Sequence, residues 1–166
     1  MKIKISSLKD GEHEFRFEED IRKLDLEKPF VGKYYTKVNL SKYLNQLVLD
    51  AATSVKAELE CDRCAKIYST QIESRYKMVY LHDQPEGQDD LVDVTYITRD
   101  TDKIDITEDV RDYILLAVPM KKLCNEDCKG LCPRCGKNLN DGQCSCSPEE
   151  VDNRWKPLLE LKNKLN

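Results

Sequence analysis

Hydrophobic and polar side chains alternate along most of the first half of the chain. The alternation is clearest between residues 30 and 81, where β-branched and aromatic residues fill many of the apolar positions. It runs over residues 34–40, 47–51, 55–59 and 67–80. A period of two residues with such side chains is typical of strands that bury one face. We therefore predict that this region forms antiparallel strands.

Shorter segments outside this region show related patterns. Met1–Ser6, Glu12–Phe17 and Leu91–Tyr96 each predict a strand, and Ile104–Ile106 predicts a brief extended piece. The charged segment Glu18–Leu26 fits either a helix or a loop.

A helix is predicted from Thr107 to the residues before Pro119. Thr107 suits the N-cap, and Glu108 and Asp109 suit the first turn because acidic side chains interact favourably with the helix dipole. Four apolar residues are spaced to lie on one buried face: Val110, Ile114, Leu115 and Val118. Pro119 ends the helix because proline cannot donate the next backbone hydrogen bond.

A further helix is predicted at the C-terminal end, starting near Asp152 or Asn153. Trp155 and the leucines at 158, 161 and 165 follow helical spacing. Core packing or docking of Trp155 is favoured over stacking of its ring on a base.

Length and charge narrow the class of protein. A chain of 166 residues suits one domain, or one domain with a small appendage, and it contains no apolar run long enough for a transmembrane helix or a signal peptide. We therefore expect a cytoplasmic protein with no membrane partner.

The net charge is −4, and residues 83–112 carry 11 acidic and 3 basic side chains. Any contact with nucleic acid must then be local. Asp83–Asp90 is predicted to be a polar loop, and a solvated surface is favoured over a partner surface for the acidic run.

Eight cysteines dominate the candidate chemistry. Six lie between Cys124 and Cys146, and Cys61 and Cys64 form a separate C-x-x-C at the tip of a predicted hairpin. Eight thiols are the number that two tetrahedral four-cysteine zinc sites require, and zinc binds soft thiolates well. The C-P-R-C-G segment is the strongest signal, because its turn directs both sulfurs to one side and Gly136 permits a positive φ. Disulfides, an iron–sulfur cluster and redox-active thiols stay open as alternatives.

The spacing favours one division of the cysteines into two groups. The compact local group is Cys132, Cys135, Cys144 and Cys146. The remaining group joins the hairpin tip to the segment after the helix: Cys61, Cys64, Cys124 and Cys128. Two alternatives stay open: Cys124 or Cys128 could join the Cys132 knuckle and leave a mixed second site, or a single zinc ion could be bound with one set of thiols free.

These patterns together predict an α+β fold. We expect a mostly antiparallel β-sheet with a few helices and a C-terminal Cys-rich zinc module. The predicted divisions are a β-rich domain over residues 1–120, a zinc-binding module over 121–150 and a C-terminal helix over 151–166.

Five cations flank the cysteines: Arg63, Lys66, Lys129, Arg134 and Lys137. They suit two roles equally well: compensating the negative charge of the four-thiolate metal sites and contacting RNA phosphates. The sequence contains no Gly-rich phosphate loop, no H-E-x-x-H motif and no nucleophile–base pattern, so we expect no enzymatic activity and no small-molecule substrate. Closed four-thiolate sites also leave no open position for a catalytic zinc.

Three stretches of this sequence resemble one family. They are L-E-C-D-R-C at Leu59–Cys64, I-D-I…I-L-L-A-V-P-M at Ile104–Met120, and C-x3-C-K-G-L-C-P-R-C-G-K-N-L-N…C-x-C at Cys124–Cys146. Together they resemble the YceD family, the large ribosomal RNA subunit accumulation proteins. The tail Asp152–Leu161 is similar to the family's closing segment, with Asn153 where proline is usual.

The resemblance implies a non-enzymatic ribosome biogenesis factor that supports the accumulation of large-subunit (23S) ribosomal RNA. Its expected partner is precursor large-subunit rRNA or a pre-ribosomal particle, with a large-subunit ribosomal protein as a further candidate. The alternative is a zinc-stapled adaptor that binds proteins without touching RNA.

Overall fold

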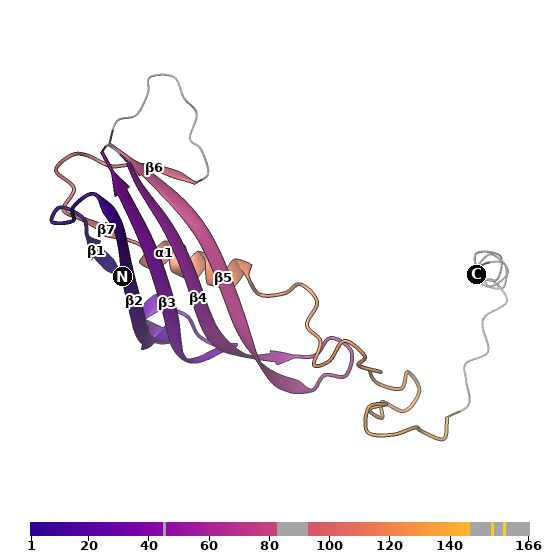
Figure 1. Ribbon diagram of the computed structural model, residues 1–166. Helices are drawn as coiled ribbons and strands as arrows, with labels where there is room; N and C mark the ends of the chain where they lie inside the picture. The colour runs from indigo at the N-terminus through magenta and orange to yellow at the C-terminus, as the bar shows by residue number, and fades with distance from the viewer. Residues whose placement is uncertain (45, 83–92, 147–153, 155–157, 159–166) are drawn as a thin grey trace.

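A five-stranded sheet forms the body of the molecule (Figure 1). The computed structural model describes residues 1–44, 46–82, 93–146, 154 and 158. The strands are β2 (Gly11–Asp20), β3 (Phe30–Tyr43), β4 (Gln46–Glu60), β5 (Ile67–Leu81) and β6 (Val94–Tyr96), in the order β2-β3-β4-β5-β6. The four long strands pair antiparallel, and β6 pairs parallel with β5. The predicted α+β class with a mostly antiparallel sheet is confirmed.

Short elements complete the fold. Strand β1 (Lys2–Lys4) pairs antiparallel with β7 (Lys103–Asp105), so the strand predicted over Met1–Ser6 meets the extended piece predicted over Ile104–Ile106. The charged segment after Phe17 first extends β2 to Asp20 and then forms the 3₁₀ helix η1 (Ile21–Leu24). The α-helix α1 (Thr107–Leu116) follows β7 directly.

Strand alternation places the core on one face of the sheet. Residues such as Val38, Leu49 and Val55 are fully buried there, and Val110 and Ile114 of α1 pack into the same cluster. Helix α1 contacts β5, β4 and η1, and Figure 1 shows it lying across this face. Full burial of each large apolar side chain contributes about 1.5–3 kcal/mol.

One polar pair lies inside this core, between β3 and β4. The two apolar runs 47–51 and 55–59 are interrupted by Thr53, yet they belong to one strand. Thr53 is buried, and its hydroxyl lies 2.9 Å from the hydroxyl of Thr36 on β3. Each buried hydroxyl is therefore satisfied by its cross-strand neighbour, so the polar residue does not break the strand.

Three details of the predicted helix are wrong. The N-cap is Ile106, and Thr107 is the first helical residue. The Thr107 hydroxyl does not cap the helix but donates to Asp105 (2.5 Å), which also accepts from the Thr107 backbone N–H (3.0 Å). Leu115 is 45% exposed instead of buried. It lies about 100° further round the helix than Ile114, which takes it off the face that meets the sheet. Val118 is partly buried but lies beyond the end of α1 at Leu116.

From α1 the chain runs along the sheet to the β4–β5 hairpin tip and continues into the Cys-rich segment beyond it (Figure 1). No helix in the described part of the chain has the length and apolar character needed to cross a membrane. The predicted polar loop Asp83–Asp90, the first residues of Leu91–Tyr96 and nearly all of the predicted C-terminal helix, Trp155 included, lie outside the described residues. The division at residues 120 and 150 stays a prediction.

Candidate metal centre

The first C-x-x-C is a knuckle at the tip of the β4–β5 hairpin, as predicted. Cys61 and Cys64 lie in the turn that follows the last paired residues of the two strands. The Cys61 N–H donates to the Lys66 carbonyl at 3.0 Å, and the Ala65 N–H donates to the Cys61 carbonyl at 2.9 Å. Ala65 has a φ of 53°, in the left-handed region. The tight turn buries both thiols on one side of the hairpin tip.

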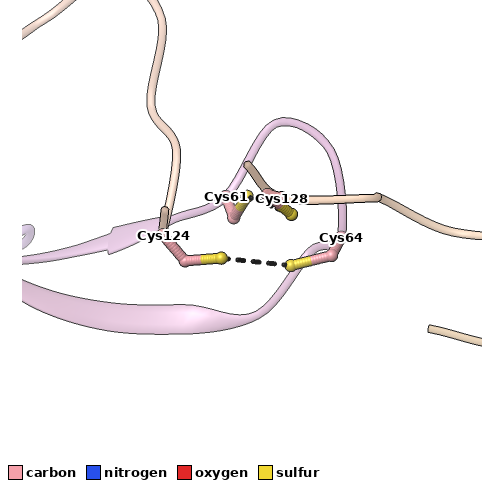
Figure 2. A group of neighbouring side chains, drawn as sticks. All are labelled: Cys61, Cys64, Cys124 and Cys128. Atoms are coloured by element: carbon pink, nitrogen blue, oxygen red, sulfur yellow. Dashed lines mark hydrogen bonds between the residues drawn. The ribbon is translucent and has the colours of Figure 1, made fainter. Parts of the chain in front are cut away.

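The segment from residue 121 to residue 131, which follows α1 and is called the strap below, brings two more cysteines to this knuckle. Figure 2 shows Cys124 and Cys128 facing Cys64 and Cys61, with Sγ–Sγ distances of 3.6 Å for Cys64–Cys124 and 3.8 Å for Cys61–Cys128. The four sulfurs lie within 4.8 Å of one another. A tetrahedral site with Zn–S bonds of about 2.3 Å places its sulfurs about 3.8 Å apart, so the spacing fits a four-thiolate metal ion.

Arg63 holds the strap against the knuckle. Its Nη1 donates to the carbonyls of Glu126 at 3.1 Å and Cys128 at 2.8 Å, and its own carbonyl accepts from the Leu131 N–H at 3.1 Å. Gly130 has a φ of 75°, and a Cβ at this position would lie 3.0 Å from the Arg63 carbonyl oxygen. The close approach of the two segments therefore depends on glycine at position 130.

The second knuckle repeats the backbone pattern of the first. The Cys132 N–H donates to the Lys137 carbonyl at 2.8 Å, and the Gly136 N–H donates to the Cys132 carbonyl at 2.9 Å. Gly136 has a φ of 70°, as its place in the C-P-R-C-G turn predicts. The knuckle at Cys61 has the same two hydrogen bonds, and Ala65 occupies the left-handed position that Gly136 occupies here. The two C-x-x-C motifs therefore form equivalent turns.

The second sulfur group is completed by two cysteines further along the chain. Cys144 Sγ lies 3.4 Å from Cys132 Sγ, and the Lys137 ammonium donates to the Gln143 carbonyl at 2.9 Å beside them. With Cys135 and Cys146, the four sulfurs again lie within 4.8 Å of one another. The structure thus gathers the eight sulfurs into the two groups that the sequence spacing favoured, and the mixed arrangement is not the one observed.

The electrostatics within each group differ from thiol to thiol. Desolvation by burial raises the pKa of Cys61, but backbone N–H groups within the knuckle and at Cys124 outweigh it and lower that pKa to about 6. In the second group, the backbone N–H groups of its own knuckle lower the pKa of Cys132 to about 6. One cysteine at the start of each knuckle is therefore readily ionised.

The opposite shift occurs at another thiol of each group. Burial, followed by hydrogen bonds with the neighbouring thiols, raises the pKa of Cys124 to about 12. A hydrogen bond with the Cys135 thiol, followed by burial, raises the pKa of Cys146 to about 12. The thiols of each group therefore differ in acidity, and a bound cation would favour the thiolate form of all four.

The five predicted cations are all exposed around these groups. Arg63 and Lys137 also hold backbone carbonyls of the Cys-rich segment, a structural role that the sequence did not specify. Both four-residue groups consist of cysteine alone in the described part of the chain. His13 belongs to neither group, and its Nε2 lies 2.8 Å from the Lys9 carbonyl oxygen.

Two residues at the site were missed by sequence reasoning. Asp62 hydrogen-bonds the backbone of Lys122, and Asn140 donates to the Cys128 sulfur from the loop between Cys135 and Cys144. Their positions inside a C-x-x-C and inside the C-x8-C loop were visible in the sequence. Their partners were not, because those partners come from other segments.

Comparison with known proteins finds one family and several relatives. The family model described as "Large ribosomal RNA subunit accumulation protein YceD" matches residues 49–162. A relative from Arabidopsis thaliana, the chloroplastic "Large ribosomal RNA subunit accumulation protein YCED homolog 1", is 26% identical over 154 residues, covering 77% of this chain and 48% of the relative. The protein of the same name from Zea mays is 28% identical over 144 residues, covering 69% and 48%.

Bacterial relatives match a shorter part of the chain. An uncharacterized protein of Mycobacterium tuberculosis is 27% identical over 103 residues, covering 61% of this chain and 49% of the relative. The chain thus spans about half the length of the curated relatives it matches. No solved structure matches the chain.

Proposed function

The chain belongs to the YceD family of large ribosomal RNA subunit accumulation proteins, and we propose that it supports the accumulation of large-subunit (23S) ribosomal RNA. It acts without catalysing a reaction, by binding precursor rRNA or a pre-ribosomal particle through its Cys-rich end. The family match supports the process. The arrangement of sulfurs and cations beyond the hairpin tip supports the mode of binding.

Each four-cysteine group binds one structural zinc ion in this proposal. The Sγ–Sγ distances of 3.4–3.8 Å suit tetrahedral zinc, and the donor set is entirely thiolate. Four thiolates complete the coordination of zinc, so neither ion keeps an open position for water or substrate. The zinc ions then hold residues 124–146 against the hairpin tip and keep the exposed cations in place.

The exposed cations around the two sulfur groups carry the RNA-binding proposal. Lys66 follows the first knuckle, Lys129 follows Cys128, and Arg134 lies between the two cysteines of the second knuckle. Cations on a rigid module can contact several phosphates at once without the entropic cost of ordering a flexible segment.

The experiment is a binding titration with precursor large-subunit rRNA at several salt concentrations. Because Lys137 holds the Gln143 carbonyl, the informative variant combines Lys129→Glu with Arg134→Glu and leaves Lys137 intact. We expect weaker binding and a log–log salt slope that is shallower by about one to two. The matched control is Arg75→Glu with Lys77→Glu, which reverses two exposed charges on β5. Equal affinities and salt slopes for both variants and the parent chain would reject this RNA surface.

The adaptor function is the second candidate, and one observation favours it. Leu116 is 78% exposed and Met120 is 101% exposed, just where the chain leaves α1 for the Cys-rich segment. Exposed apolar side chains of this size suit a protein partner. If the purified chain binds a large-subunit ribosomal protein after nuclease treatment and shifts no rRNA fragment, the adaptor function replaces direct RNA binding.

A further inference from the structure

The side chain of Asn140 belongs by sequence to the second sulfur group but contacts the first. It lies on the loop between Cys135 and Cys144, two cysteines of the second group. Its Nδ2 donates to the Sγ of Cys128, a member of the first group, at 3.3 Å. Its Oδ1 accepts from the Lys129 N–H at 2.8 Å, next to that same cysteine.

The loop that carries Asn140 is fixed at several points. Asn138 Oδ1 accepts from the Asn140 backbone N–H at 3.0 Å and from its Nδ2 at 2.7 Å. The Leu139 N–H donates to the Gly130 carbonyl at 2.9 Å, and Asn138 forms an antiparallel bridge with Leu131. These bonds orient the carboxamide so that its N–H group faces the sulfur.

An N–H donor at a metal-bound sulfur affects the affinity of the site. A divalent ion with four thiolates carries a net charge of about −2, so a donor at one sulfur stabilises the thiolate form. Partners of this kind typically change metal affinity by about 10–100-fold when they are removed. Asn140 supplies such a donor to the first group from outside it.

The position of this donor depends on the second group. Both ends of the Asn140 loop lead into that group, at Cys135 and Cys144, so a metal ion held there closes the loop. Without the ion, the loop loses this closure, and only its own hydrogen bonds still orient the carboxamide.

We propose that Asn140 is a positioning residue that couples the two metal sites, so that metal bound at the second group raises the affinity of the first. The inference rests on the proposed function, because it requires that both groups bind a metal ion. Thermodynamic linkage requires that metal at the first group raise the affinity of the second by the same factor.

The test uses the reduced, metal-free full chain and cobalt(II), with the thiolate-to-cobalt absorption as the readout and a chelator to set the free-ion concentration. The parent chain is compared with Asn140→Ala and with a second-group variant, Cys135→Ser with Cys146→Ser. We expect each to weaken cobalt binding at the first group by about 10–100-fold. Adding Asn140→Ala to the second-group variant is expected to cause little further loss, because both changes remove the same contact.

Two further variants make the test specific. A first-group variant, Cys61→Ser with Cys64→Ser, should weaken the second group by the same factor as the second-group variant weakens the first. Asn140→Asp keeps the size of the side chain but places an acceptor oxygen near the sulfur, and it should weaken the first group at least as much as alanine does. Asn39→Ala, on the exposed face of β3, is the control and should leave both constants unchanged.

The possible results separate this inference from the proposed function. If cobalt binds both groups but first-group affinity is the same with and without the second group, the coupling is wrong while the metal sites stand. The same conclusion follows if Asn140→Ala weakens the first group and the second-group variant does not. If neither cobalt nor zinc binds the parent chain, the metal assignment in the proposed function fails as well. Far-UV circular dichroism checks that each variant keeps its sheet.

Discussion

Asp62 and Lys122 exchange two hydrogen bonds across the base of the first sulfur group. The Asp62 N–H donates to the Lys122 carbonyl at 2.8 Å, and the Lys122 N–H donates to Asp62 Oδ2 at 2.7 Å. One residue lies inside the first knuckle and the other precedes Cys124. This pair places the strap so that Cys124 Sγ lies 3.6 Å from Cys64 Sγ.

Removal of the Asp62 side chain should loosen the strap. We expect Asp62→Ala to destabilise the chain by about 1 kcal/mol, because the Lys122 N–H loses a charged acceptor. Zinc release from the first group to a chromogenic chelator should become faster. Asp62→Asn keeps an acceptor oxygen and should release zinc at a rate closer to that of the parent chain. Equal rates for Asp62→Ala and the parent chain would show that the pair has no role in holding the strap.

The close approach at Gly130 gives a second prediction. Gly130→Ala adds a Cβ that would lie 3.0 Å from the Arg63 carbonyl oxygen, on a residue with a φ of 75°. Gly32→Ala is the matched control, since Gly32 has a φ of 80° and no neighbouring atom lies within 4 Å of the position that a Cβ would take there. Backbone strain of about 1–2 kcal/mol is common to both variants.

The difference between these two variants measures the contact itself. We expect Gly130→Ala to lose more stability in urea unfolding than Gly32→Ala and, unlike it, to release zinc faster from the first group. Indistinguishable behaviour would mean that the Arg63–Gly130 approach can relax at no cost.

Metal removal should separate the Cys-rich segment from the sheet. The sheet and α1 have their own apolar core, whereas the sulfur groups are held mainly by turns and hydrogen bonds. A chelator with a reducing agent should therefore make residues 121–146 susceptible to protease while the β-sheet signal in circular dichroism persists, and added zinc should reverse the change. Elemental analysis should find two zinc ions per chain. Loss of the sheet signal together with the zinc would show that the two parts fold as one unit.

The start of α1 predicts a dependence of stability on pH. The hydrogen bond from the Thr107 hydroxyl, together with the Thr107 N–H, holds the pKa of Asp105 below the ordinary aspartate value of 3.8, against the opposing effect of burial. A lowered pKa in the folded state means that the stabilisation is present above the unfolded value and is lost as the pH falls through the folded value.

Asp105→Ala should therefore cost about 1 kcal/mol at pH 7, because the Thr107 N–H and hydroxyl lose a charged acceptor. The difference in unfolding free energy between variant and parent should shrink as the pH falls below the ordinary aspartate pKa. Asp105→Asn keeps an acceptor but does not titrate, so its own contribution should not change over this range. A constant difference between Asp105→Ala and the parent from pH 7 to acid pH would contradict the assigned role.

Much of the fold follows from local sequence patterns. Alternation around Val38 and Leu49 predicts which face of each strand is buried, because successive side chains in a strand point to opposite faces. The C-x-x-C spacing likewise predicts two tight turns, since each turn is closed by hydrogen bonds between near neighbours in the chain. The left-handed residue at Gly136 belongs to the same local pattern.

Other features depend on segments that meet only in the folded chain. The apolar character of Leu115 predicted burial, but its exposure follows from where α1 meets the sheet. Arg63 and Asn140 are ordinary polar residues in the sequence, and their roles come from the Cys128 carbonyl and sulfur that the fold brings to them.

Residue patterns alone were thus enough for most of the strands, the two knuckles and the family, because each depends on neighbouring residues or on a spaced motif. The pairing of Asp62 with Lys122 and the contact of Asn140 with Cys128 emerged only from the folded chain. Hydrogen bonds between distant segments depend on how the sheet, the helix and the strap pack together, and no local period encodes that packing.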